Sequence, residues 1–222
     1  MPIECMYTLN LEYKETILQY LSSLGDELSY SAGSLIDFDF GMKDFCYLVL
    51  DGAIKQYFID SEGKERILFI LSRGDIFGDI TMLQNTTDMV ISESMTNCVV
   101  RKIGKTEYWK AASTYSALNK ALLTFGSTKF RLLLFQLYDQ SYHKVDLQLQ
   151  HLLCRLAVQH GVPVHSGILI NLVLTHQDLA DMLGSGRSTV TRNLKKLRSA
   201  GIIEIRSRKI FIPDKEILTT PV

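Results

Sequence analysis

THQDLADMLGSGRSTVTRNLKKL, residues 175–197, is the stretch that decides the fold of the C-terminal part of this chain. Thr175 followed three residues later by Asp178 is typical of the start of a helix, and Gly184 is typical of its end. A second helix is expected to begin at Gly186 or Arg187. The pattern therefore predicts two short helices joined by a glycine turn.

The second of these helices has two different faces. Val190, Leu194 and Leu197 recur at helical spacing and are expected to face inward. The opposite face carries polar or cationic side chains and no acid: Arg187, Ser188, Thr191, Arg192 and Lys195. In a helix-turn-helix the first helix braces the second, whose polar side chains contact bases and phosphates in the major groove. An ordinary helical hairpin with a solvated face is the alternative for this stretch alone.

The residues that follow Gly201 add a wing to this pair of helices. The sequence IIEIRSRKIFIP predicts two short strands, 202–205 and 210–212, around a turn with three cations. We expect bases to be contacted by Arg187, Ser188, Thr191 and Arg192. We expect backbone phosphates to be contacted by Thr189, Lys195, Arg206, Arg208 and Lys209, although Thr189 fits equally as a packing residue.

Residues 184–192, GSGRSTVTR, resemble the recognition helix of the cyclic-AMP receptor and fumarate-nitrate regulator (CRP/FNR) superfamily, which reads approximately Gly-x-Ser-Arg-x-Thr-Val-Ser-Arg. Gly186 stands where the family usually has a Ser cap, a mild change because Gly also caps helices. Ser188 stands where many members have a Glu that accepts a hydrogen bond from a cytosine amine, so the half-site is expected to differ. The resemblance implies a winged helix-turn-helix over residues 174–213, with palindromic double-stranded DNA and RNA polymerase as partners.

Charge is distributed unevenly along the 222 residues although the formal net charge is zero. Residues 141–222 contain 11 Lys and Arg against 6 Asp and Glu, whereas residues 1–140 contain 13 against 18. A basic C-terminal part is the electrostatic pattern expected of a nucleic-acid-binding domain. Long apolar runs and the pattern of a signal peptide are both absent from the sequence, which predicts a cytoplasmic protein with no membrane partner.

Residues 28–103 predict an all-β barrel or jelly roll, because short apolar runs alternate with glycines about every ten residues. The clearest strands are expected at 45–50, 53–59, 66–71 and 94–103, with a hairpin turn at 61–64. This part resembles the cyclic-nucleotide-binding-type sensor domain of the same superfamily, through residues 47–52, YLVLDG, and residues 74–79, GDIFGD. The expected fold class is thus α+β, with an N-terminal jelly roll, a long dimerisation helix and a C-terminal winged helix.

Cyclic nucleotide is not the expected effector. Family members that bind it place a Glu on the ribose and an Arg-Ser pair on the phosphate, whereas this chain has Asp79, Asp88 and Met89 in those places. No Lys or Arg occurs between residues 74 and 100, so a buried phosphate would lack a counter-ion. A small apolar or aromatic effector is expected instead, as in family members that sense haloaromatic acids, unless these side chains fill the barrel. The predicted pocket comprises Phe69, Phe77, Asp79, Met82, Met89 and Lys129.

The residues that a cofactor or an active site would need are scattered. All five histidines lie at residue 143 or later, and the four cysteines, including Cys5, form no C-x-x-C pair. We therefore expect no metal, no cofactor and no enzymatic activity, and we reject the alternative of a cupin-type metalloenzyme. A ligand-binding module that acts through protein contacts is the alternative to a DNA-binding regulator.

Residues 116–138 predict a long helix with a heptad seam. The seam places Leu118, Leu122, Phe125 and Leu132, together with Lys129, along one stripe that is expected to pair with a second subunit. Lys129 could pair with an anionic effector or set the register of the seam. A second apolar face, which includes Phe130 and Leu134, would pack on the barrel. We thus expect a homodimer with three parts, residues 1–115 as the sensor domain, 116–140 as the dimerisation helix and 141–222 as the DNA-binding domain.

Overall fold

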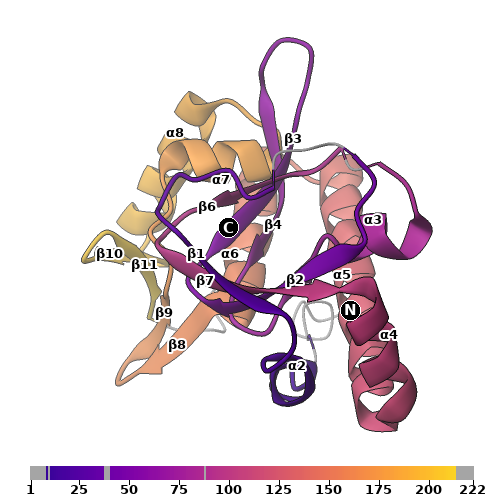
Figure 1. The fold of residues 1–222 in the computed structure, drawn as a ribbon. Coiled ribbons are helices and arrows are strands. Elements are labelled where there is room, and N and C mark those ends of the chain that lie inside the picture. The colour runs from indigo at the N-terminus through magenta and orange to yellow at the C-terminus, as the bar shows by residue number, and fades with distance from the viewer. Residues whose placement is uncertain (1–8, 10, 38–40, 88, 214–222) are drawn as a thin grey trace. The chain divides into compact units, whose positions relative to one another are not determined.

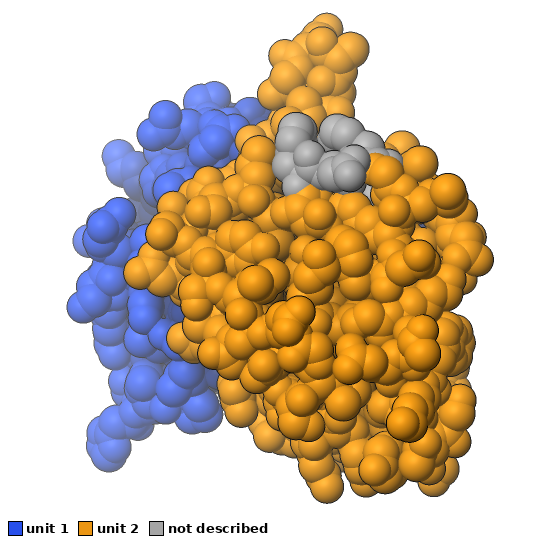
Figure 2. All heavy atoms as spheres, viewed as in Figure 1, with its two compact units in different colours: residues 1–9, 131–222 blue, residues 10–130 orange. Residues whose placement is uncertain are grey.

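The computed structural model describes residues 9, 11–37, 41–87 and 89–213. The chain divides into two compact units (Figure 2). Residues 10–130, orange in Figure 2, are called the first unit below because they come first along the chain, and residues 131–222 with residues 1–9, blue in Figure 2, are called the second unit. The division falls within the long helix α5, Ser116–Tyr142. Among the described residues, no helix combines the length and the apolar composition that crossing a membrane requires.

Two antiparallel sheets form the β part of the first unit (Figure 1). The strand orders are β1-β7-β2-β5 and β4-β3-β6. The strands are β1 Asp26–Tyr30, β2 Phe45–Asp51, β3 Ile54–Ile59, β4 Glu65–Leu71, β5 Ile76–Phe77, β6 Ile91–Ser94 and β7 Cys98–Gly104. The helices of this unit are α2 Tyr13–Leu21, α3 Asp79–Gln84, α4 Lys105–Thr114 and the first half of α5. The predicted α+β class with a β-rich N-terminal domain is confirmed.

The strand predicted at residues 94–103 is two strands in the structure. β6 ends at Ser94 and β7 begins at Cys98, because the side chains between them hold a turn. Thr96 Oγ1 accepts a hydrogen bond from Ala53 N at 3.0 Å, and Asn97 Oδ1 accepts one from Ala32 N at 3.0 Å. The side-chain oxygens of these turn residues thus satisfy backbone donors of neighbouring segments.

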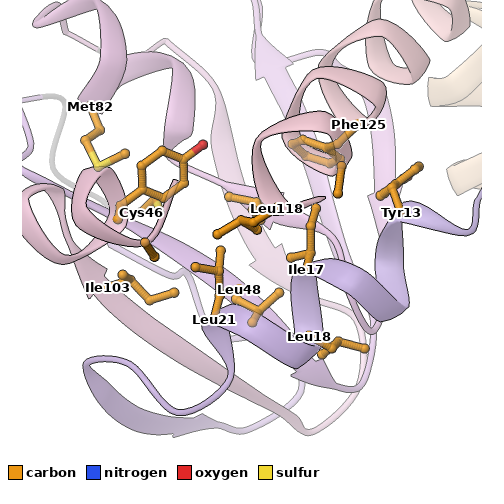
Figure 3. Close-up of a cluster of buried hydrophobic side chains, with 14 residues drawn as sticks. Tyr13, Ile17, Leu18, Leu21, Cys46, Leu48, Met82, Ile103, Leu118 and Phe125 are labelled. Atoms are coloured by element: carbon orange, nitrogen blue, oxygen red, sulfur yellow. The ribbon is translucent and has the colours of Figure 1, made fainter. Parts of the chain in front are cut away.

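The main core of the first unit lies between α2, β2 and α5 (Figure 3). Ile17 and Leu21 share the apolar face of α2 and are fully buried. They pack in one cluster with Leu48 of β2 and with Leu118 and Phe125 of α5. A second cluster, which contains Tyr47, Val49, Ile54, Phe77 and Val100, fills the inside of the β structure.

The long helix α5 presents the opposite face from the one predicted. Leu118 and Phe125 belong to the core of their own unit, and Leu122 packs against that core. Leu132 is also buried, at 7% exposure. Leu118 and Phe125 are therefore removed from the predicted dimer seam, because a heptad stripe indicates a partner without saying whether the partner is another subunit. The exposed apolar side chains lie on the other face: Leu123, Phe130, Leu133, Leu134, Leu137 and Tyr138.

The second unit holds a helical bundle and a four-stranded sheet with the order β10-β11-β9-β8. Its helices are α6 Val145–His160, α7 His176–Leu183 and α8 Arg187–Ser199. Its strands are β8 Gly161–Val164, β9 Gly167–Ile170, β10 Glu204–Arg206 and β11 Lys209–Ile212. The β8–β9 hairpin was not predicted, whereas α7, α8 and the wing strands were.

Candidate nucleic-acid interface

Helices α7 and α8 form the predicted pair, and their ends are fixed by local hydrogen bonds. Asp178 N donates to Thr175 Oγ1 at 3.0 Å, and Thr175 N donates to Asp178 Oδ2 at 2.7 Å. This reciprocal capping box starts α7 at His176. Gly184 ends α7 in the left-handed conformation, with φ of 62°. The predicted start and end of α7 are confirmed, and so is the predicted start of α8, which begins at Arg187.

The predicted faces of α8 are confirmed as well. Val190, Leu194 and Leu197 are buried, and Asn193, which the sequence pattern did not single out, is buried beside them. The side chains of the other face are exposed: Arg187, Ser188, Thr191, Arg192 and Lys195. Thr189 is half-buried, which fits both of its expected roles. Within the described part of the chain, the three cations of this face form no ion pair with an acid.

One residue that sequence reasoning missed lies beside this face. The ring nitrogen Nδ1 of His176 lies 2.8 Å from Thr191 Oγ1, and both side chains are exposed. His176 is the first residue of α7, so it comes from the bracing helix rather than from the recognition helix. A sequence signal exists only in hindsight, because fifteen positions and a turn separate the two residues.

The wing is a tight hairpin whose cations differ in their partners. Ser207 and Arg208 have positive φ values of 49° and 66°, which is typical of a two-residue type I′ turn. Arg206 therefore lies on a strand and not in the turn as predicted. Its guanidinium forms an ion pair with Glu204 at 2.8 Å and lies over the ring of Phe211 at 3.3 Å from its centroid.

The two remaining wing cations are placed differently from Arg206. Lys209 Nζ donates to Asn171 Oδ1 at 2.6 Å, which directs it toward the segment before α7. Arg208 is exposed at the tip of the hairpin. The structure thus separates Arg208, which faces solvent, from two cations that already have partners in the chain.

The side chains predicted to line an effector pocket are only partly brought together, since Lys129 lies close to Asp79 and Phe69 but the others are dispersed. Phe77 lies in the core inside the β structure, whereas Met82 lies in the cluster that includes α2 and α5. Met89 is 71% exposed. The predicted pocket is therefore corrected for these three residues, since two of them serve as core packing and the third faces solvent.

Lys129 connects the long helix to its own barrel. Its Nζ donates to the carbonyl of Ile76 at 2.9 Å and lies 3.8 Å from a carboxylate oxygen of Asp79. The ammonium also lies over the rings of Phe125 and Phe69, at 4.6 Å and 5.5 Å from their centroids. The ammonium of Lys129 is thus already paired within its own unit, and it is not directed at a second subunit.

A buried polar cluster joins the end of α5 to α6. Asp139 Oδ1 lies 2.7 Å from His151 Nδ1, and its other carboxylate oxygen forms an ion pair with Arg155. Burial raises the pKa of Asp139, but the hydrogen bond from His151 and the charge of Arg155 outweigh it and hold that pKa below its ordinary value. Gln148 Nε2 also links α6 to the segment before it, by donating to the backbone oxygen of His143 at 2.8 Å.

Asp139, His143 and His151 could also offer ligand atoms to one metal ion, since these atoms lie within 4.8 Å of one another. The guanidinium of Arg155 on the same carboxylate argues against this use. A divalent cation there would place three positive charges around one buried carboxylate, which burial strongly penalises. The cluster is better explained as an internal ion pair.

The cysteines that the structure describes have no reactive setting. Cys46 and Cys98 are buried, and burial raises the pKa of the Cys154 thiol to about 12. A raised pKa disfavours the thiolate that redox reactions require. Cys5 lies outside the described residues.

Comparisons with known proteins agree with this architecture. Residues 27–115 match the family described as cyclic nucleotide-binding domain, and residues 148–220 match the Crp-like helix-turn-helix domain. The anaerobic regulatory protein of Bacillus subtilis is 32% identical over 174 residues, which cover 78% of this chain and 73% of that protein.

Solved structures show the same fold at lower identity. A CooA mutant from Carboxydothermus hydrogenoformans has a TM-score of 0.78 at 23% identity, covering 96% of this chain and 97% of that one. CprK complexed with OCPA has a TM-score of 0.69 at 16% identity, covering 90% and 92%. With the two domain matches in the same order and the Bacillus relative above, the chain belongs to the CRP/FNR family of transcription regulators.

Proposed function

We propose that this chain is a cytoplasmic, homodimeric regulator that binds a palindromic operator through α8 and the β10–β11 wing, and acts on RNA polymerase from there. The observation that carries the proposal is the exposed face of α8. Arg187, Arg192 and Lys195 lie on it without an ion-pair partner among the described residues. Unpaired cations on one side of a helix suit the phosphates and guanine edges of a major groove.

The exposed face of α5 supports the homodimer. Leu123, Phe130, Leu134 and Leu137 recur at intervals of seven, four and three residues and are between 47% and 69% exposed. Such a stripe suits the seam of a two-stranded coiled coil, and we propose it in place of the seam expected from the sequence. A two-fold axis along this face would give two recognition helices that read half-sites about one helical turn apart.

The proposed trigger is a small molecule other than cyclic AMP. Lys129 already forms contacts with Asp79 and with the carbonyl of Ile76. Its ammonium is therefore not available to bind the phosphate of a cyclic nucleotide. The CprK structure, which has a similar fold, is a complex with OCPA, and this supports a regulator that responds to a ligand. Thermal-shift measurements with cyclic AMP and with haloaromatic acids test the two classes of ligand, and a shift with cyclic AMP alone would contradict the proposal.

The test of DNA binding is a selection of random duplex DNA on the purified protein at physiological salt, followed by sequencing. An enriched palindrome is the expected result, and the Arg187→Ala/Arg192→Ala double variant should lose the enrichment. Lys110→Ala is the matched control, because Lys110 is an exposed cation on α4 of the first unit. If neither the protein alone nor the protein with cell extract enriches any sequence or shows salt-dependent binding, the alternative of a module that acts through protein contacts is favoured.

A further inference from the structure

The contact between His176 and Thr191 concerns the base specificity of the proposed DNA-binding surface, and the inference drawn from it rests on that proposed function. Thr191 lies on the exposed face of α8 between the positions of Ser188 and Lys195. His176 reaches it from α7 with Nδ1 at 2.8 Å from the threonine oxygen. A side chain of the bracing helix therefore contacts a side chain expected to read a base.

The backbone that carries His176 is fixed at the start of α7. The capping box between Thr175 and Asp178 fixes the backbone on either side of it. Leu179 and Ala180, which follow in α7, are buried at 1% and 0% exposure. The imidazole thus extends from a rigid helix start, and rigid support is what a specificity-determining side chain requires.

The contact restrains the rotation of the Thr191 side chain. Threonine in a helix divides between two rotamers, because its hydroxyl can bond a carbonyl one turn earlier. Thr114, Thr124 and Thr128 make that bond in this chain, to the carbonyls of Lys110, Lys120 and Thr124. For Thr191 the partner of the hydroxyl within the described residues is His176.

The contact also fixes what the hydroxyl can offer to a base. A threonine hydroxyl has one proton to donate and two lone pairs to accept with. If Nδ1 accepts that proton, Thr191 presents only lone pairs, which suit the amino groups of adenine and cytosine. If Nδ1 carries the proton and donates it, the threonine proton is free for the acceptors of guanine or thymine.

We propose that His176 is a positioning residue that sets the rotamer and the hydrogen-bond polarity of Thr191, and thereby the base preference at one position of each half-site. Ser188 serves as an internal comparison, because its hydroxyl lies on the same face without a comparable partner among the described residues. Loss of His176 should accordingly affect one base position and leave the position read by Ser188 unchanged.

The experiment compares full-length wild-type protein with His176→Ala, Thr191→Ala and the double variant on the selected operator. Binding is measured for the operator and for its three substitutions at every half-site position. We expect His176→Ala to reduce the preference at one position by about threefold to tenfold, which corresponds to one hydrogen bond. Thr191→Ala should affect the same position, and the double variant should add nothing further, because the two residues act as one unit.

Two conservative variants separate positioning from simple charge. His176→Gln retains a side chain that accepts and donates, and is expected to restore part of the preference. His176→Lys supplies a cation for phosphates in place of the ring nitrogen, so it should raise the affinity for all sequences alike without restoring the preference. Circular dichroism melts verify that each variant is folded, which is expected because His176 is exposed.

The outcomes are distinguishable. A uniform loss of binding on all sequences in His176→Ala, with a shallower dependence on salt, would show that His176 is a phosphate contact and would overturn the inference. Additive effects of His176→Ala and Thr191→Ala at different positions would overturn it as well. If wild-type protein selects no sequence, the proposed function itself fails and the inference fails with it.

Discussion

Arg192 and Lys209 are both cations of the second unit, but their surroundings predict different roles. Arg192 is exposed on α8 and can present a forked pair of donors to a base. Lys209 is half-buried on the wing and bonds Asn171. From their exposure and contacts we expect Arg192 to contact a base and Lys209 to contact a backbone phosphate.

Substituting each of the two gives a first prediction. Arg192→Ala should weaken binding to the selected operator by about 1–3 kcal/mol and weaken random DNA much less. Lys209→Ala should weaken all sequences alike and reduce the slope of log K against log salt by about one. Fluorescence anisotropy on both DNAs over a salt series measures the two effects. Equal losses on operator and random DNA in Arg192→Ala would remove it from the base-contacting set.

Asp139 gives a second prediction, which concerns stability. Asp139 and Arg155 have side chains that are 3% and 5% exposed, so Asp139→Asn leaves a buried guanidinium without its counter-charge. We expect a loss of about 3–5 kcal/mol in the free energy of unfolding of the second unit. Urea denaturation followed by circular dichroism measures it, with Glu62→Gln on the exposed β3–β4 turn as the control.

The same residue gives the stability of the protein a dependence on pH. Because the pKa of Asp139 is lowered by folding, its contribution is complete above the ordinary aspartate pKa of about 4 and is lost as the pH falls through the lowered value. Wild-type protein should therefore lose stability below about pH 4 by this route, and Asp139→Asn should lose less over the same interval. An identical pH dependence in both proteins would show that Asp139 does not contribute.

Gly161 lies at the end of helix α6, and the physical reason for a glycine there differs from the usual one for a helix end. A glycine at this place predicts the end of a helix, and α6 ends at His160. The backbone of Gly161 is extended, with φ of −79°, so no left-handed conformation calls for glycine there. The requirement is space, because an added Cβ would lie 2.1 Å from the carbonyl oxygen of Ala157.

Gly161→Ala is the third prediction. The new methyl group must displace backbone at the junction of α6 and β8, and overpacking of this kind costs about 1–3 kcal/mol. Gly63→Ala, on the β3–β4 turn, is a useful contrast, because its Cβ meets nothing within 4 Å and its cost should come from its positive φ alone. Denaturation midpoints of the two variants compare them. A Gly161→Ala protein as stable as wild type would contradict the close approach.

Helix α5 marks what a sequence can and cannot settle about an element. Its existence and its start were predicted correctly, because the apolar positions recur at helical spacing. Its faces were assigned in reverse, since Leu118 and Phe125 contact the core of their own unit. The stripe is equally apolar in both arrangements, and only the contacts of the folded chain distinguish them. The capping box of α7 was predictable, by contrast, because every atom involved lies within four residues.

The whole molecule combines a mostly predictable scaffold with a less predictable site. The class, the domain order and the recognition helix followed from periodicity and motifs, which are local properties of the sequence. The partners of Lys129, Arg206 and His176 did not, because each contact joins residues that only the fold brings together. The exposure of the residues on the outer face of α8 was predictable, whereas the side chains that contact those residues were not.

The fourth prediction concerns assembly. Leu137→Glu places a charge on the exposed face of α5, where Leu137 is 62% exposed, and should convert a dimer into a folded monomer with weakened operator binding. Trp109→Glu, at a position that is 49% exposed on α4, should leave the dimer intact. Light scattering coupled to size-exclusion chromatography measures the mass of each. A dimeric Leu137→Glu protein, or a monomeric wild type, would contradict this interface.

The buried cluster around Asp139 has a mechanical consequence. The carboxylate of Asp139 contacts both His151 and Arg155, which lie four positions apart on α6. Asp139 itself belongs to the last turn of α5. Two contacts on successive turns of α6 should restrain its rotation about its own axis more than a single contact would. The junction between α5 and α6 is therefore expected to be rigid. We therefore expect a rotation of the end of α5 to be transmitted to α6.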